Sequence, residues 1–223
     1  MRLIAYPDRA QLYHGLAKLL AERLAAAIAA RGHASLSVPG GTTPGPVFDI
    51  LSQMPLDWAK VAVFLNDERW VGEDSPRSNT RLLRERLLCG PAAKAKLVPL
   101  YSPADQPEEK LCALAEGLAP HLPISVLLLG MGADMHTASL FPGADLLTQA
   151  LAADAPPLMA LRAEAAGEPR ITITAPVLQA AETIHILITG AETRAAIAHA
   201  CDLPPEQAPI RAVLDNATVH WAE

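Results

Sequence analysis

The chain has little of several features that mark particular classes of protein. It contains three cysteines, Cys89, Cys112 and Cys201, which are far apart and form no CxxC motif. This spacing favours neither a disulfide framework nor a structural zinc site, and it fits reduced thiols in the cytoplasm. No apolar run approaches the roughly 20 residues that a membrane-spanning helix needs, and Pro7 and Asp8 come too early for the apolar core of a signal peptide. We therefore expect a soluble, cytoplasmic protein with no membrane partner.

Positive charge is also sparse. The 223 residues carry 18 Lys and Arg against 24 Asp and Glu, a net charge of -6, with no basic cluster. Because nucleic-acid binding depends on neutralising phosphates, we expect no nucleic-acid partner, whereas a small anionic ligand needs only a few local cations. Hydrophobic residues make up 51% of the chain, enough for a substantial core. The length predicts a single domain over residues 1–223.

Apolar segments with the periods of strands and helices alternate along the chain. We expect strands at 3–6, 36–38, 61–65, 124–129, 171–174 and 184–189. Helices are expected from Asp8 to Gly32 and at 47–54, 82–88, 108–118, 176–181 and 192–200. The Pro- and Ala-rich stretch 150–169 is interpreted as a surface excursion. The alternation predicts an α/β fold, with a mostly parallel sheet covered by helices on both faces.

In such sheets ligands bind beyond the carboxyl ends of the strands, and three of these ends are unusual. The first is the PGGTTP segment after the predicted strand 36–38. Gly40 and Gly41 allow backbone conformations in which successive N–H groups point at an anion, and the hydroxyls of Thr42 and Thr43 add donors. Pro44 suits a first helical turn, whose N–H groups favour a phosphate. The alternative is an ordinary tight turn with a threonine cap.

The second unusual end is the segment Asn66-Asp67-Glu68-Arg69, which follows a strand of buried type. A surface salt bridge is one interpretation. Near a sugar phosphate, a carboxylate such as Asp67 could instead hold a sugar hydroxyl or orient an imidazole, while Arg69 counters negative charge.

The third end, Gly130 to Ser139, contains His136. An imidazole can take a proton from water near neutral pH, which makes His136 the candidate general base. Asp134 or Asp67 could fix the tautomer of its ring. A structural role for His136 is the alternative. Ser139 lies one helical turn further on, but without a GxSxG elbow it is expected to act as a cap or a substrate contact.

Six motifs, in this order, resemble the 6-phosphogluconolactonase family, a branch of the group that includes glucosamine-6-phosphate isomerase/deaminase and ribose-5-phosphate isomerase. They are PGGTTP (39–44), NDERWV (66–71), SNTRLL (78–83), GMGADMHTASLFPG (130–143), PRITIT (169–174) and ITGAET (188–193). The TASLFP stretch is the most specific, since it distinguishes this branch from the deaminases. The resemblance implies a three-layer α/β/α Rossmann-like domain. It also implies hydrolysis of 6-phospho-D-glucono-1,5-lactone to 6-phosphogluconate in the oxidative pentose phosphate pathway, without a metal or an organic cofactor.

The resemblance also assigns roles to residues. His136 matches the family's base, and Asp67 and Arg69 match its active-site DER motif. The candidates for binding the substrate and its phosphate are Gly40, Gly41, Thr42, Thr43, Asn79, Arg170 and Arg194.

The chain departs from the family pattern at two positions. Met135 stands where the family has glycine, so the backbone there is expected to be strained or to lack the glycine conformation. Thr193 stands where a phosphate-binding lysine is expected, and the adjacent Arg194 is rotated by about 100° on a helix. Arg170 precedes a predicted strand. In a parallel strand this position would place it at the edge opposite the proposed site, so a role for Arg170 in phosphate binding requires an antiparallel strand or a returning loop.

Two other functions remain open from the sequence. A sugar-phosphate isomerase or deaminase of the same fold would use a carboxylate such as Asp67 to abstract a carbon-bound proton. A non-catalytic sugar-phosphate sensor is the second alternative, for which the departures at Met135 and Thr193 leave room.

Overall fold

The computed structural model describes residues 1–223, with the side chain of Ala165 left aside. Seven parallel strands form the main sheet, in the order β1-β10-β9-β6-β2-β3-β5. They are β1 (Arg2–Ala5), β2 (Ala34–Val38), β3 (Val61–Leu65), β5 (Lys96–Leu97), β6 (Val126–Gly130), β9 (Ile184–Thr189) and β10 (Ala217–Ala222). Every residue of β2 and β3 is buried, as expected of strands covered on both faces.

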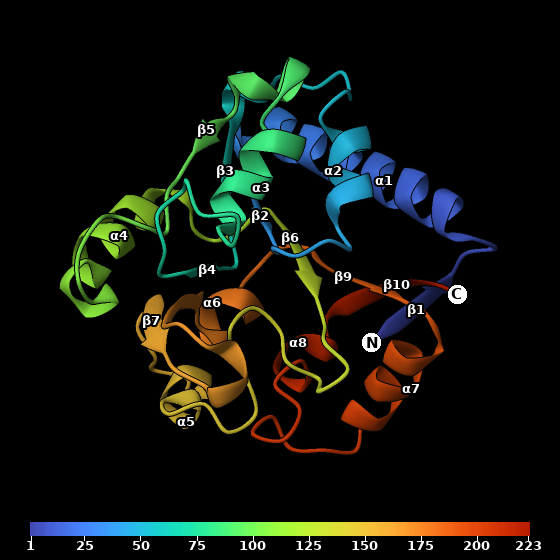
Figure 1. Cartoon of the computed structure of the whole chain (residues 1–223). Coiled ribbons are helices and arrows are strands. Elements are labelled where there is room, and N and C mark those ends of the chain that lie inside the picture. The colour runs from blue at the N-terminus through green and yellow to red at the C-terminus, as the bar shows by residue number, and fades with distance from the viewer.

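Helices cover the sheet on two sides and complete the predicted three layers (Figure 1). On one side lie α1 (Arg9–Arg31), α2 (Gly45–Leu51) and α3 (Asn79–Arg86), and on the other α6 (Ala175–Gln179), α7 (Ala191–Ala200) and α8 (Arg211–Leu214). The helices α4 (Leu111–Leu118) and α5 (Leu147–Leu151) lie at the flank of the molecule. Short 3-10 helices are η1 (Trp58–Lys60), η2 (Gly90–Lys94), η3 (Pro107–Glu109), η4 (Ala119–His121) and η5 (Glu164–Ala166). Among the described residues, no helix is long and apolar enough to cross a membrane.

The first helix shows how local signals set an element. The Asp8 carboxylate accepts hydrogen bonds from the backbone and side chain of Gln11 and so caps the first turn. Gly32 ends the helix with φ of 80°, a conformation that glycine adopts without strain. Leu12, Leu16, Leu20 and Leu24 repeat at helical spacing and are fully buried against the sheet. The predicted bounds of this helix, Asp8 to Gly32, are confirmed.

A second, smaller sheet is antiparallel and has the order β4-β8-β7. Its strands are β4 (Asp67–Arg69), β7 (Leu158–Leu161) and β8 (Arg170–Ile173). Interpreting 150–169 as a surface excursion was therefore wrong, because β7 lies within it and three of its four residues are buried. The strand is short and follows two prolines, and its burial comes from pairing with β8, which local sequence does not reveal.

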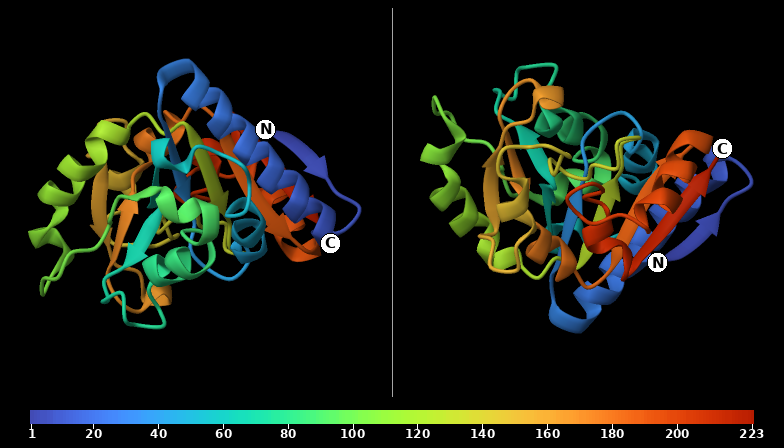
Figure 2. Two further views of the ribbon diagram at one scale, coloured as in Figure 1. Left: turned by 90° about the horizontal axis from the view of Figure 1, so that it is seen from above. Right: turned by 90° about the horizontal axis from the view of Figure 1, so that it is seen from below.

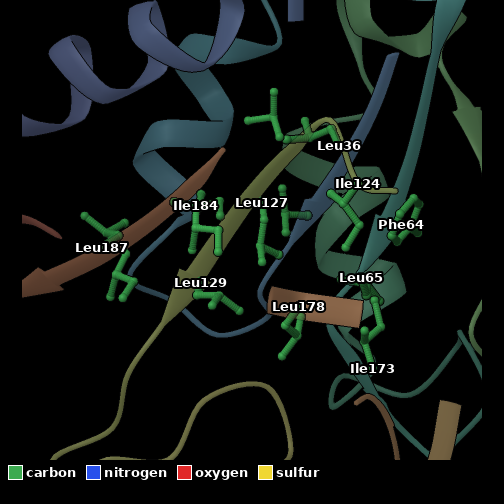
Figure 3. Close-up of a cluster of buried hydrophobic side chains, with 14 of the residues drawn as sticks. Leu36, Phe64, Leu65, Ile124, Leu127, Leu129, Ile173, Leu178, Ile184 and Leu187 are labelled. Carbon is green, nitrogen blue, oxygen red and sulfur yellow. The ribbon is translucent and has the colours of Figure 1, made fainter. Parts of the chain in front are cut away.

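The two sheets share one hydrophobic core. Figure 3 shows Leu129 of β6 near Leu178 of α6, and Ile173 of β8 near Leu65 of β3, all within the same cluster. Because β8 is antiparallel, the start of the strand, with Arg170, reaches the same region as β4. This is the antiparallel placement that a binding role for Arg170 requires.

The strand order also locates a crevice. From β2 the chain continues through β3 to β5 on one side, whereas β6 continues through β9 to β10 on the other. The switch point therefore lies between β2 and β6, where open α/β sheets bind ligands. The terminal strands β1 and β10 pair at the far edge of the sheet, where both chain ends lie (Figure 2).

Candidate active site

A cavity of about 330 Å³ opens at the carboxyl ends of β2, β3, β6 and β9. It brings together most of the residues expected from the sequence, namely Gly40, Gly41, Thr43, Asp67, Arg69, Asn79, His136 and Arg170. Thr42 and Arg194 are not among the described residues that line it, whereas Thr193 is. The motifs lie far apart in the chain and meet because parallel strands end at the same edge.

The two glycines of the PGGTTP loop meet different structural needs. Gly41 has φ of 85°, a left-handed conformation that favours glycine. At Gly40 the requirement is space, because a Cβ there would lie 2.1 Å from the side chain of Asn79. The loop therefore passes directly against Asn79 before it enters α2.

Asn79 in turn orients an arginine. Its Nδ2 donates to the carbonyl of Asp67 at 3.1 Å, and its Oδ1 accepts from Nη1 of Arg69 at 3.0 Å. The same Nη1 donates to the carbonyl of Arg77 at 2.6 Å, and Arg69 Nε faces Glu168 Oε1 at 3.5 Å. Asn79 therefore links the Asp67 backbone to Arg69 at the cavity wall, a contact that the motif alone did not reveal.

Glu68 has a structural role that the sequence did not reveal. Its carboxylate is fully buried and accepts from the N–H groups of Asn79 and Thr80 and from the hydroxyls of Ser78 and Thr80, at 2.7 to 3.2 Å. A carboxylate at this place satisfies the first N–H groups of α3 and interacts favourably with the helix dipole. The alternation of side chains along β4 explains why Glu68 points away from the cavity that Asp67 and Arg69 line.

Asp67 and Arg170 form a buried pair beside the cavity. In the antiparallel register Asp67 is opposite Thr172 and Arg69 is opposite Arg170, so these four side chains share one face. Asp67 Oδ2 accepts from the Ser139 hydroxyl at 2.5 Å and from Nη1 of Arg170 at 3.5 Å. Burial lowers the pKa of the Arg170 guanidinium, while the Asp67 carboxylate acts in the opposite direction.

The pairing of two arginines is informative about the ligand. Like charges directly opposite each other in a sheet are destabilising. The Nε atoms of both Arg69 and Arg170 are buried and have no hydrogen-bond partner among the described residues. Arg69 faces Glu168 and Arg170 faces Asp67. Because each arginine nevertheless keeps a donor without a hydrogen bond, the arrangement suits an anionic group in the cavity.

His136 lies in the loop after β6 and has a carboxylate partner. Its Nδ1–H donates to Oδ1 of Asp134 at 2.5 Å, which leaves the lone pair on Nε2 to accept a proton. Of the two carboxylates considered from the sequence, Asp134 therefore orients the imidazole, while Asp67 supports Arg170. The His136 side chain is 30% exposed, so water can reach it.

The backbone around His136 is unusual. Met135 has φ of 65° and Ala138 has φ of 49°, both in the left-handed region. The expectation of strain at Met135 is therefore confirmed, since the chain keeps the glycine-like conformation without a glycine. Gly132 packs against the imidazole, and a Cβ there would lie 2.4 Å from the His136 ring.

Ser139 and Arg194 occupy places other than those expected. Ser139 is fully buried, and its hydroxyl supports Asp67 and does not reach the cavity. Arg194 lies with its guanidinium 4.8 Å from the centre of the Trp221 ring and is not among the described residues that line the cavity. The hydroxyl of Thr193 donates to the carbonyl of Thr189 at 2.8 Å. Among the described residues, no group of three or more His, Cys, Asp or Glu side chains could hold a metal ion.

Known proteins resemble this chain over its whole length. A 6-phosphogluconolactonase from Rhizobium meliloti is 44% identical, with 97% of this chain and 97% of the relative aligned. One from Pseudomonas aeruginosa is 40% identical over 98% of this chain and 94% of the relative. The crystal structure of a 6-phosphogluconolactonase from Shewanella baltica OS155 superposes with a TM-score of 0.96 at 34% identity, covering 100% of this chain and 98% of that one.

More distant structures share the fold. A monomeric glucosamine-6-phosphate deaminase superposes with a TM-score of 0.83 over 100% of this chain and 98% of that one, at 16% identity. The family described as glucosamine-6-phosphate isomerases/6-phosphogluconolactonase matches residues 7–221, which is nearly all of the sequence. The chain therefore belongs to the glucosamine-6-phosphate isomerase/6-phosphogluconolactonase family.

Proposed function

We propose that this protein hydrolyses 6-phospho-D-glucono-1,5-lactone to 6-phospho-D-gluconate by general-base activation of water. The observation that carries the proposal is the pairing, in one cavity, of a carboxylate-oriented imidazole with two arginines that face each other. An imidazole of this kind activates water, and the arginines suit a substrate with a negative charge. The activity for which the relatives are named supports the same substrate.

In the proposed mechanism His136 acts first as base and then as acid. Nε2 takes a proton from a water molecule as its oxygen attacks C1 of the lactone. The oxyanion that forms on C1 accepts hydrogen bonds from donors of the cavity wall, such as Arg69 and loop N–H groups. The C1–ring oxygen bond then breaks, the imidazolium returns its proton to the departing oxygen, and the new carboxylic acid ionises in water. Because a lactone carbonyl is already electrophilic, a positioned water suffices without a covalent intermediate.

The phosphate of the substrate would be bound by Arg170, the Gly40–Gly41 backbone and the Thr43 hydroxyl. A charge-assisted contact to Arg170 would relieve its unpartnered Nε. Thr193 lies at the cavity where a lysine is expected, but its hydroxyl is neutral and already donates to the carbonyl of Thr189. Arg170 therefore supplies the positive charge that Thr193 lacks.

An isomerase or deaminase is less well supported by the surroundings of Asp67. A base for a carbon-bound proton must be able to accept it, but Asp67 already accepts from Ser139 and faces Arg170. Both contacts are made by Oδ2, so that oxygen is already engaged in the protein.

The experiment that tests the proposal follows freshly generated 6-phosphogluconolactone by NMR, with and without purified protein. The spontaneous hydrolysis is subtracted, and glucosamine 6-phosphate is assayed in parallel. Faster lactone decay at catalytic concentrations of protein supports the lactonase. Turnover of glucosamine 6-phosphate alone would support the deaminase, and binding without turnover of either compound would support the sensor.

A further inference from the structure

We infer that Phe141 is a positioning residue that holds the imidazole plane of His136 and links this base to Arg170. The inference rests on the proposed function, because it assigns Phe141 a role in the same reaction. Phe141 is 8% exposed and is not among the described residues that line the cavity, so it acts on the substrate only through its neighbours.

The turn between His136 and Phe141 is held at several points. The Thr137 hydroxyl donates to the carbonyl of Gly130 at 2.9 Å, and the Leu140 N–H donates to the carbonyl of Thr137 at 3.0 Å. The Ser139 N–H donates to Oγ1 of Thr172 on β8 at 3.1 Å. The turn therefore carries Phe141 back to His136 along a fixed path, with Ala138 in its left-handed conformation at the centre.

The rings of Phe141 and His136 are stacked, with centroids 4.3 Å apart and an angle of 26° between their planes. The bond to Asp134 fixes the position of Nδ1, but one hydrogen bond leaves the ring free to tilt, since the χ2 preference of histidine is broad. Gly132 limits the ring at Cε1 and Nδ1. The face of Phe141 packs against the imidazole and sets the plane of the ring, and with it the direction of the Nε2 lone pair. A base on a loop depends on such support for its geometry.

The same aromatic ring lies close to Arg170. The Cζ of Arg170 is 5.7 Å from the Phe141 centroid, within the range of a cation–π contact. Arg170 has other supports, since its Nη1 donates to Asp67 and its Nη2 to the carbonyl of Ala166 at 3.4 Å. Loss of the ring should therefore affect the base more than the arginine, and kcat more than KM.

The experiment compares two non-aromatic variants, Phe141→Leu and Phe141→Met, with the aromatic variant Phe141→Tyr. We expect kcat to fall about tenfold in the first two, with KM raised by no more than about threefold, and to stay within about threefold in Phe141→Tyr. The control is Leu20→Ala, which removes a fully buried side chain of α1 without touching the cavity. It should lower stability and leave kcat of the folded enzyme unchanged.

A second readout is independent of catalysis. In the wild type and in Phe141→Tyr, the Cε1 and Cδ2 protons of His136 should show an upfield ring-current shift in NMR spectra, and this shift should disappear in Phe141→Leu and Phe141→Met. Folded Leu and Met variants with wild-type kcat overturn the inference, whether or not the shift is lost. If the wild type hydrolyses no lactone, the proposed function fails, and unchanged His136 shifts in Phe141→Leu would then overturn the positioning role as well.

Discussion

Histidines occupy two contrasting regions of this molecule. His136 lies in a loop at the carboxyl edge of the sheet, is 30% exposed and donates to a carboxylate. His185 and His220 lie on the adjacent strands β9 and β10, are 5% and 0% exposed, and are hydrogen-bonded to each other at 3.1 Å. The Tyr6 hydroxyl is hydrogen-bonded to the other nitrogen of His220 at 2.9 Å.

The surroundings of the two regions predict opposite roles for the same side chain. Burial, with a smaller contribution from nearby positive groups, lowers the pKa of His185 to about 4 and that of His220 to about 3. A proton added to this pair would be desolvated, which is the main reason for the lowered pKa values. In the loop at the carboxyl edge, the Asp134 carboxylate orients the His136 ring and water can reach it, which suits the proposed proton transfer. We therefore expect substitutions at His136 to change turnover, and substitutions in the buried pair of His185 and His220 to change stability.

The largest expected effect is that of His136→Ala. Loss of the general base should lower kcat by roughly 100- to 10,000-fold, with little change in KM. Because His136 lies in a loop at the surface, the free energy of unfolding should change by less than about 1 kcal/mol. Steady-state kinetics and urea unfolding measure the two effects, and a rate within twofold of the wild type would contradict the assignment.

The next effect concerns acid stability. An unfolded imidazole has a pKa of 6.5, so folded-state values of about 4 and 3 mean that the buried pair stabilises the fold above pH 6.5. This stability should decline as the pH falls from 6.5 towards 4, by on the order of 3 kcal/mol for each histidine. In His185→Gln the loss of stability between pH 6.5 and 4 should be smaller, because one of the two buried imidazoles is gone.

Urea unfolding at several values between pH 7.5 and 4.5 measures this decline. The control is His14→Gln, which removes an exposed histidine of α1 and should leave the pH dependence as in the wild type. A His185→Gln protein with an unchanged slope would show that other groups cause the acid sensitivity.

A smaller effect should separate two arginines of the substrate-binding candidates. Arg170→Gln removes a buried charge at the cavity, and we expect KM for the lactone to rise about 10- to 100-fold. Arg194→Gln should leave KM within about twofold, because that guanidinium lies over Trp221. Equal effects of the two substitutions would mean that Arg194 leaves the indole to reach the phosphate.

The smallest expected effect is the relief of backbone strain beside the base. Met135→Ala removes the side chain and keeps a residue that disfavours φ of 65°, whereas Met135→Gly removes the side chain and the strain together. The glycine variant should be the more stable of the two by about 1 kcal/mol. Thermal or urea unfolding checks this difference, and equal stabilities would mean that the turn stores no strain at Met135.

Local patterns were enough to predict much of the fold and the site. The long first helix follows from its aspartate cap, its leucine spacing and its terminal glycine. The apolar runs of β2, β3 and β6 predict buried parallel strands, and the polar segments at their carboxyl ends predict where Gly40, Asp67 and His136 meet. These inferences succeed because each depends on neighbouring residues or on the rule that parallel strands end together.

Other features depend on partners that are distant in the chain. The strands β7 and β10 have no clear pattern of their own and are defined by pairing with β8 and β9. Ser139 reaches Asp67 across 72 positions, and Arg170 reaches it across 103. Which carboxylate orients His136, and which arginine faces the cavity, are set by these long-range contacts.

The linear order of residues thus determines which elements form and which chemical groups stand at their ends, because capping, periodicity and turn chemistry act over a few residues. The tertiary structure alone decides that Glu68 anchors a helix, that Asp67 supports Arg170, and that Phe141 stacks on His136. A side chain's role depends on what lies within a few ångströms of it, and in a folded chain those neighbours come mostly from distant parts of the sequence.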